Sequence, residues 1–300
     1  MNEPLSISVI DLPVHAVTYE SALEHCLQLA DTQTPRAVSA ANTHIAAAAR
    51  KDVVFRHIMR SFDLILPDGM PLVWVMNAKL QRQKRPPLKN RIYGPYFMKY
   101  AIEHAPAGTT HFLFGGSQSC LDELQIELKK LNPTVQIVGA LSPPYREWNE
   151  EDLQLFSQHI NQANADFIWV ALGGEKQEKW IINNQHRFNR GVFFAIGDAF
   201  ELLAGRRRFA PAWAQQNGFT WLYRLIQEPR RMWRRYLKYN SLFLYYLLRD
   251  FFTSKEKSCP IAEKTVERSD RVNVLGVGVS ATSMNTAVGD LLDARIHAQR

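Results

Sequence analysis

Short apolar runs alternate with longer amphipathic stretches along most of the chain. The apolar runs are rich in β-branched and aromatic residues and predict strands at Ser6–Ile10, Arg36–Ser39, Leu64–Leu66, His111–Phe114, Gln136–Ala140, Phe167–Ala171 and Gly191–Ile196. The stretches between them carry apolar residues at helical spacing and predict helices at Tyr19–Ala30, Thr43–Arg60, Tyr96–His104, Gln118–Leu131, Glu150–Asn161 and Gln177–Arg190. This alternation is typical of α/β proteins.

The order of these elements predicts a Rossmann-like, mostly parallel sheet flanked by helices, which we assign to an α/β body at 1–204. A helical appendage at 205–252 follows, and Pro229 is expected to divide it into two helices. Residues 253–271 are polar and predict a linker. Residues 272–300 again have a strand–helix pattern, which is either the start of a second copy of the unit or a chance tail.

The appendage carries most of the chain's positive charge. The segment from Arg206 to Arg249 contains ten Lys or Arg residues and one acid, Glu228. The net charge of this segment therefore exceeds that of the whole chain, which is +7. Aromatic residues lie between these arginines at helical spacing. Such a basic amphipathic segment suits an anionic surface with an apolar underside, which describes both a membrane and a nucleic acid. The residues expected to meet a membrane are Arg230, Trp233, Arg234, Arg235, Tyr236 and Lys238.

Composition excludes several classes of protein. The three cysteines, Cys26, Cys120 and Cys259, are far apart and unpaired with histidines, so neither a disulfide framework nor a zinc site is expected. The first residues lack the basic-then-apolar pattern of a signal peptide. The longest apolar run, Leu242–Leu248, is far shorter than the roughly 20 residues that span a bilayer. We therefore expect a cytoplasmic protein without metal or cofactor.

Asp68 is the first candidate for catalysis. It follows the apolar strand Leu64–Leu66 in the sequence Pro67-Asp68-Gly69, and ligands of parallel sheets bind at the carboxyl ends of strands. A carboxylate there could act as general base on a hydroxyl. The alternative is an ordinary turn with Asp as its side-chain cap, which the spacing alone favours.

Glycines follow three other predicted strands. They are Gly115-Gly116, Gly173-Gly174 and Gly197, and the first two pairs precede predicted helices. Glycine lets a phosphate approach the backbone, and a helix N-terminus donates N–H groups to it. Gln177, next to the second pair, offers both a donor and an acceptor to a sugar or base. Each loop alone fits a plain turn equally well, and Glu178 is expected to be solvated.

Asn42 and Arg91 are candidates for ligand contacts. Asn42 follows a predicted strand, and Arg91 precedes Ile92-Tyr93-Gly94. The alternatives are a helix N-cap for Asn42 and a surface charge for Arg91. The histidines show no metal-ligand spacing and are taken as structural.

In order along the chain, several motifs together resemble the WecB/TagA/CpsF glycosyltransferases, glycosyltransferase family 26. They are Pro67-Asp68-Gly69-Met70, Arg91-Ile92-Tyr93-Gly94, Phe112–Gly116, Val170–Gly173 with Lys176-Gln177-Glu178, Ala210-Pro211, Gly218–Leu225 and Glu228–Arg231. The resemblance covers about Ser6 to Phe252. It implies inverting transfer of a sugar from a UDP-sugar to a polyprenyl-diphosphate-linked sugar, without an essential metal.

The resemblance also implies roles for individual residues. Asp68 matches the proposed catalytic base of the family. Asn42, Arg91 and Gln177 match its pocket residues, and we add Gly115, Gly116 and Gly174 to the predicted substrate-binding residues. Arg208, Arg224 and Arg231 match arginines of an appendage that closes over the site and meets the membrane.

Four positions depart from the family pattern. Ala40 stands where Thr is common, Tyr96 where an acid is usual, Phe209 where Arg precedes Ala-Pro, and Thr220 where Glu precedes Trp. These departures leave the donor sugar open between N-acetylmannosamine-type and glucose-type sugars, and they leave the acceptor open.

The sequence therefore favours a peripheral glycosyltransferase on the inner face of the cell membrane that makes cell-surface polysaccharide. Its expected partners are a UDP-sugar, a polyprenyl-diphosphate-linked sugar and the membrane surface, with no nucleic acid; self-association as a homo-oligomer stays open. The alternatives are a nucleic-acid-binding protein and an inactive regulatory copy of the enzyme. Retention of Asp68, Asn42, Arg91 and Gln177 argues against the last.

Overall fold

The computed structural model describes residues 3–253, and these belong to one compact unit. The predicted strand–helix stub at 272–300, and the predicted linker after Thr253, lie outside the described residues.

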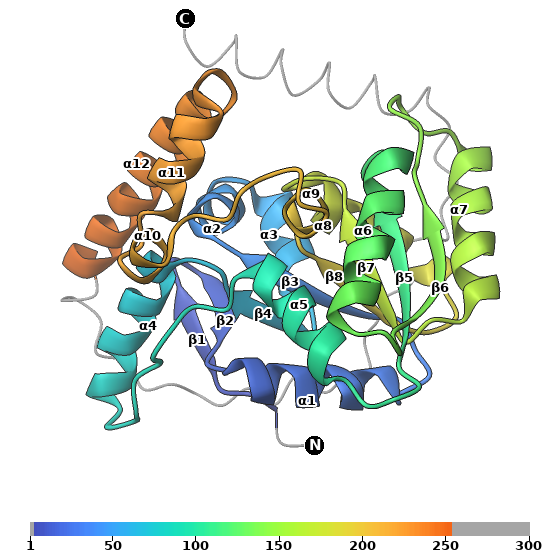
Figure 1. The fold of residues 1–300 in the computed structure, drawn as a ribbon. Helices are drawn as coiled ribbons and strands as arrows, with labels where there is room; N and C mark the ends of the chain where they lie inside the picture. Colours follow the sequence, from blue (N-terminus) through green and yellow to red (C-terminus); the bar gives the residue numbers. More distant parts are fainter. Residues whose placement is uncertain (1–2, 254–300) are drawn as a thin grey trace, which may run out of the picture. The chain divides into compact units, whose positions relative to one another are not determined.

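A parallel sheet forms the centre of this unit (Figure 1). Over residues 3–253, six strands pair in parallel in the order β4-β3-β8-β7-β5-β6. Their bounds are β3 Arg36–Ala41, β4 Leu64–Pro67, β5 Thr110–Gly115, β6 Gln136–Leu141, β7 Phe167–Ala171 and β8 Val192–Ala195. The predicted α/β fold with a parallel sheet is confirmed. Because the strands are parallel, all their carboxyl ends lie at one edge.

Helices cover both faces of the sheet, and neighbouring residues of a strand point to opposite faces. In β4, Ile65 packs into one core, whereas Leu64 and Leu66 pack into the other. The first core is covered by α2 (Thr43–Lys51), α3 (Val53–Arg60), α4 (Met70–Arg82), α7 (Glu150–Ala163) and α8 (Lys176–Asn184), which the 3-10 turn η1 (Gln185–Arg187) follows. The second is covered by α1 (Tyr19–Ala30), α5 (Gly94–His104), α6 (Gln118–Leu131) and α9 (Ala199–Leu203).

Two features of the N-terminal part differ from the prediction. The first predicted strand, β1 (Ser6–Val9), lies outside the parallel sheet and pairs antiparallel with an unpredicted strand, β2 (Leu12–His15). The predicted helix at 43–60 is broken at Asp52, whose extended backbone lets its carboxylate cap α3 by accepting from the N–H groups of Val54 and Phe55.

Up to Thr253, three helices follow α9: α10 (Ala212–Gln216), α11 (Thr220–Gln227) and α12 (Pro229–Thr253). The predicted helix boundary at Pro229 is confirmed, with the proline starting α12, but the short helix α10 before α11 was not predicted. This last helix packs along α2, where Arg50 donates to Asp250 at 3.1 Å and also pairs with Asp11. Residues from the two ends of the described chain therefore meet beside α2.

Candidate active site

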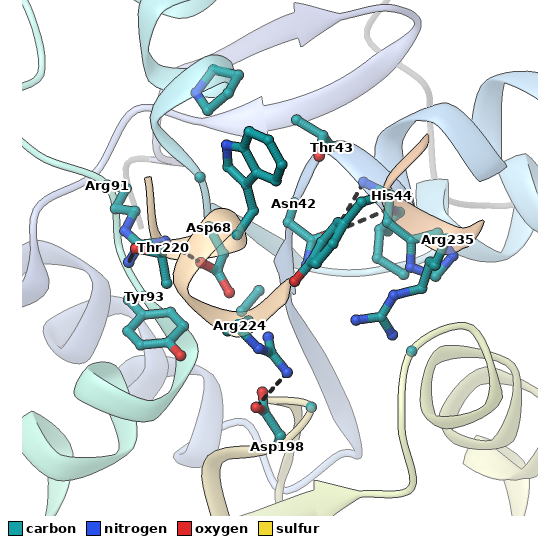
Figure 2. Close-up of a pocket in the computed structure, with 18 of the residues that line it drawn as sticks. Asn42, Thr43, His44, Asp68, Arg91, Tyr93, Asp198, Thr220, Arg224 and Arg235 are labelled. Atoms are coloured by element: carbon teal, nitrogen blue, oxygen red, sulfur yellow. Dashed lines mark hydrogen bonds and ion pairs between the residues drawn. The ribbon is translucent and has the colours of Figure 1, made fainter. Parts of the chain in front are cut away.

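A cavity of about 360 Å³ lies at the carboxyl ends of four adjacent strands, β4, β3, β8 and β7 (Figure 2). Its floor is formed by the loops that follow these strands. Its roof consists of the cavity-facing residues of α11 and α12, among them Trp221, Arg224, Arg235, Tyr236 and Asn240. Of the residues that the sequence predicted to bind substrate or catalyse, the structure brings Asn42, Asp68, Arg91, Gly174, Gln177 and Arg224 together in its lining.

Asp68 lies just after β4, with 12% of its side chain exposed. Its backbone N–H donates to the carbonyl of Ala41 on the neighbouring strand at 2.9 Å, which fixes the turn. Its carboxylate lies 3.6 Å from Nη1 of Arg91. Burial raises the pKa of Asp68 to about 6, although Arg91 and the backbone N–H of Gly94 oppose the shift. A carboxylate with this proton affinity is suited to accept a proton near neutral pH.

Arg91 joins the floor of the cavity to its roof. Its Nη2 donates to Oγ1 of Thr220 at the head of α11, at 2.9 Å, and its guanidinium lies 4.4 Å from the centre of the Tyr93 ring. The side chain is therefore a buried cavity residue rather than a surface charge. Thr220, one of the departures from the family pattern, takes part in the site through this contact.

Asn42 caps a helix and lines the cavity at once. Its Oδ1 accepts from the backbone N–H groups of His44 and Ile45 at the head of α2, at 3.0 and 3.3 Å. Since the oxygen is used in the cap, the amide nitrogen is the group that Asn42 can offer to a ligand.

Gln177 and Glu178 are both buried at the head of α8. Nε2 of Gln177 donates to Glu178 at 3.2 Å, and its Oε1 accepts from the N–H of Gly197 at 3.1 Å. The expectation that Glu178 is solvated was wrong: it is fully buried and lines the cavity, and burial raises its pKa to about 7. Gln177 thus links the head of α8 to the loop after β8.

The appendage brings arginines to this cavity. Nη2 of Arg224 donates to Asp198, in the loop after β8, at 2.5 Å, and Arg207 lies 3.7 Å from the same carboxylate. Arg208 lies outside the main cavity and lines a small adjoining pocket. The side chain of Arg231 is outside the described part of the chain.

The residues predicted to meet a membrane divide into two groups. Arg230, Trp233, Arg234 and Lys238 are exposed. Arg235 and Tyr236 instead line the cavity. Within residues 3–253, Arg235 has no carboxylate at ion-pair distance, and its Nε is buried without a hydrogen-bond partner. It is therefore a positive charge available to an anionic ligand.

Gly115 and Gly116 lie outside the cavity lining. Their loop follows β5, which is separated from β3 and β4 by β7 and β8. A Cβ on Gly115 would lie 2.4 Å from the carbonyl oxygen of Ala171, and the residue has a φ of +124°. The absence of a side chain at Gly115 therefore permits the pairing of β5 with β7 at this position. Arg206 donates to Ser119 at the head of α6, at 2.8 Å, where a phosphate was expected.

Sequence reasoning missed several cavity residues. His44 was taken as structural, Tyr93 was named only as part of a motif, and Asp198 and Asn240 were not singled out. Asp198 had a usable signal, because it follows a predicted strand just as Asp68 does. Across residues 3–253, no group of three or more His, Cys, Asp or Glu side chains is arranged to hold a metal ion.

A carboxylate beside arginines, at the carboxyl edge of a parallel sheet, is an arrangement suited to binding an anionic ligand and accepting a proton. The chain belongs to the glycosyl transferase WecG/TagA/CpsF family, whose model matches residues 7–257. It is therefore a glycosyltransferase.

Curated relatives match most of the chain. It is 31% identical over 208 residues, 69% of its length and 77% of the relative's, to the N-acetylglucosaminyldiphosphoundecaprenol N-acetyl-beta-D-mannosaminyltransferase of Bacillus subtilis (strain 168). Proteins of the same name from Bacillus spizizenii and Staphylococcus aureus (strain MW2) are 29% and 26% identical, over 66% and 71% of this chain and 73% and 77% of their own lengths.

Proposed function

We propose that this protein transfers an N-acetylmannosamine-type sugar, with inversion, from a UDP-sugar to a sugar on a polyprenyl diphosphate. The acceptor class and the donor sugar are those in the names of the relatives. The reaction serves the assembly of a cell-surface polysaccharide.

One observation supports the proposal most: Asp68 lies among cavity arginines with a pKa of about 6. In an inverting transfer, its carboxylate takes the proton of the attacking acceptor hydroxyl while the bond between the sugar and UDP breaks. The leaving diphosphate gains negative charge, which Arg91, Arg224 and Arg235 at the cavity can stabilise.

The cavity also holds two of the four departures from the family pattern, Ala40 and Thr220. The other two contact each other: the rings of Tyr96 and Phe209 stack with centroids 4.9 Å apart. An acid and an arginine of the family pattern are thus replaced by an aromatic pair. At positions 40 and 220 the family pattern has Thr and Glu, so Ala40 and Thr220 change the polar groups offered to the donor, and glucose-type donors belong in the test beside N-acetylmannosamine.

A peripheral position on the inner face of the cell membrane is part of the proposal. Among the described residues, no helix is both long and apolar enough to cross a bilayer. Trp233 and Leu237 are exposed on α12 beside Arg230, Arg234 and Lys238. Apolar and basic side chains together suit an anionic bilayer surface that also carries the lipid-linked acceptor.

The test is incubation of the protein with UDP-N-acetylmannosamine, UDP-glucose and other UDP-sugars, each with a polyprenyl-diphosphate-linked N-acetylglucosamine, followed by mass spectrometry of the lipid product. Addition of one sugar is expected with one donor, and Asp68→Asn should reduce turnover roughly 100-fold or more. Failure of every donor, or full activity in Asp68→Asn, would contradict the proposal. Tight DNA binding without vesicle binding would favour the nucleic-acid alternative.

A further inference from the structure

The carboxylate of Glu175 connects three separate parts of the fold. Glu175 lies in the loop between β7 and α8, next to the cavity-lining Gly174. Its Oε1 lies 3.0 Å from Nε2 of His44, at the head of α2, and accepts from the hydroxyl of Tyr239, on α12, at 3.1 Å. Its Oε2 lies 3.5 Å from Nζ of Lys179.

These groups act on an ionised carboxylate. The hydrogen bond from His44 lowers the pKa of Glu175 to about 2, despite its partial burial. Glu175 is therefore an acceptor across the whole working pH range, and both His44 and Tyr239 act as donors to it.

Further contacts reinforce the link between α12 and α2. The rings of His44 and Tyr239 pack with centroids 4.1 Å apart. The next residue of α12, Asn240, accepts from the hydroxyl of Thr43 at 3.0 Å. His44 and Asn240 both line the cavity, so this link lies at the junction of floor and roof.

The backbone of Glu175 provides an independent observation. Its φ of 60° and ψ of −41° lie in a region of backbone conformation that residues other than glycine rarely adopt. Such a conformation persists only where surrounding contacts hold it. Glycine would relieve the strain here but would remove the carboxylate that holds α12.

We propose that Glu175 is a positioning residue: through Tyr239 and His44 it holds α12 over the cavity, so that Arg235 and Tyr236 keep their places in the roof. The expected effects on KM and kcat rest on the proposed function, whereas the placement of α12 does not depend on it. Glu175 itself is not required to contact either substrate.

The principal variant is Tyr239→Phe, which keeps the ring and removes only the hydroxyl. Hydrogen exchange of the protein without substrate should become faster in α12. The kcat/KM for the UDP-sugar should fall about tenfold, equivalent to about 1.4 kcal/mol, with a higher KM and a lower kcat, because the roof contacts the bound donor and Arg235 also stabilises the charge that the leaving diphosphate gains. Tyr245→Phe is the matched control, since Tyr245 is an exposed tyrosine of the same helix, and it should change neither.

A second variant separates positioning from stability. Glu175→Gly should raise the KM as Tyr239→Phe does, while the melting temperature stays the same or rises because the strain is relieved. The double variant should be no worse than the worse single variant, because both remove the same contact. Glu175→Gln keeps an acceptor and should restore most of the binding.

The outcomes separate this inference from the proposed function. If no UDP-sugar is transferred, the proposed function fails, yet the exchange experiment still tests the role of Glu175. Unchanged exchange in Tyr239→Phe would overturn the inference. Additive effects of Tyr239→Phe and Glu175→Gly on KM would also overturn it.

Discussion

At the scale of single residues, Asp68 is held between opposing influences on its proton. Burial favours the neutral acid, whereas Arg91 and a backbone N–H favour the carboxylate. The folded protein binds this proton more tightly than the unfolded chain, so the contribution of Asp68 to stability falls as the pH rises from about 4 to about 6. Above that range, ionised Asp68 costs the fold about 3 kcal/mol.

This balance predicts how transfer depends on pH. We expect kcat/KM to fall as the pH drops below about 6, since a protonated Asp68 cannot accept a proton. In Asp68→Asn, kcat/KM should be low at every pH and should not fall further as the pH drops below about 6. The measurement is a pH profile of kcat/KM for the donor, with melting temperatures recorded alongside. An acidic limb that survives in Asp68→Asn would assign the ionisation to another group, such as Glu178.

Glu178 illustrates a limit of the sequence at this scale. A charged residue at the start of a helix normally faces water, and the local pattern gave no sign of burial. It is buried because Ser39 of β3 and Gln177 meet it at the carboxyl edge of the sheet. That meeting depends on which strands are neighbours, and this information is absent from the local sequence.

At the scale of elements, the alternation of apolar runs with amphipathic stretches located every described strand of the parallel sheet. The turn joining β1 to β2 escaped prediction because Ile10 and Asp11 adopt positive φ values without a glycine. Strand order could not be predicted either. It brings β4, β3, β8 and β7 to the cavity and leaves β5 beside it, so Asp68 and Gln177 came together whereas Gly115 did not.

The packing role of Gly115 gives a prediction at this scale. Gly115→Ala should lower the free energy of unfolding by about 2 kcal/mol or more, because the new Cβ meets a backbone carbonyl and φ is positive. The KM for the donor should not change. Gly108→Ala is the control: its φ is also positive, but no atom lies within 4 Å of the new Cβ, so it should cost less. Urea denaturation measures the free energy of unfolding of both variants. If Gly115→Ala is stable but has a raised KM, the loop after β5 takes part in donor binding.

At the scale of the whole molecule, the exposed basic residues of α12 lie next to the cavity. The exposed arginines of α12 lie on the same helix as Arg235 and Tyr236, which face the cavity. One helix can therefore contact a bilayer on one side and a bound substrate on the other. Helical periodicity alone could not tell the exposed side of α12 from its cavity-facing side, because both sides carry Arg and Tyr residues.

Binding to lipid vesicles tests this arrangement. The triple variant Arg230→Glu, Arg234→Glu, Lys238→Glu should weaken binding to anionic vesicles by about 100-fold or more, at about 1 kcal/mol per basic residue lost near the surface. Wild-type binding should weaken with added salt. The control variant replaces Lys89, Lys129 and Lys130, which are exposed lysines of the body, by Glu. It should bind anionic vesicles nearly as well as the wild type. Equal losses in both variants would show that net charge, rather than α12, governs binding.

The packing of α12 on α2 also bears on how the protein is made. Thr43 and Asn240 are 197 positions apart, and Arg50 and Asp250 are 200 positions apart. A ribosome releases the residues of α2 long before those of α12, and the early part of a chain begins to fold first. The sheet can thus form around Asp68 while the cavity still lacks its roof. A nascent chain therefore has no complete site until α12, which ends at Thr253, has been synthesised.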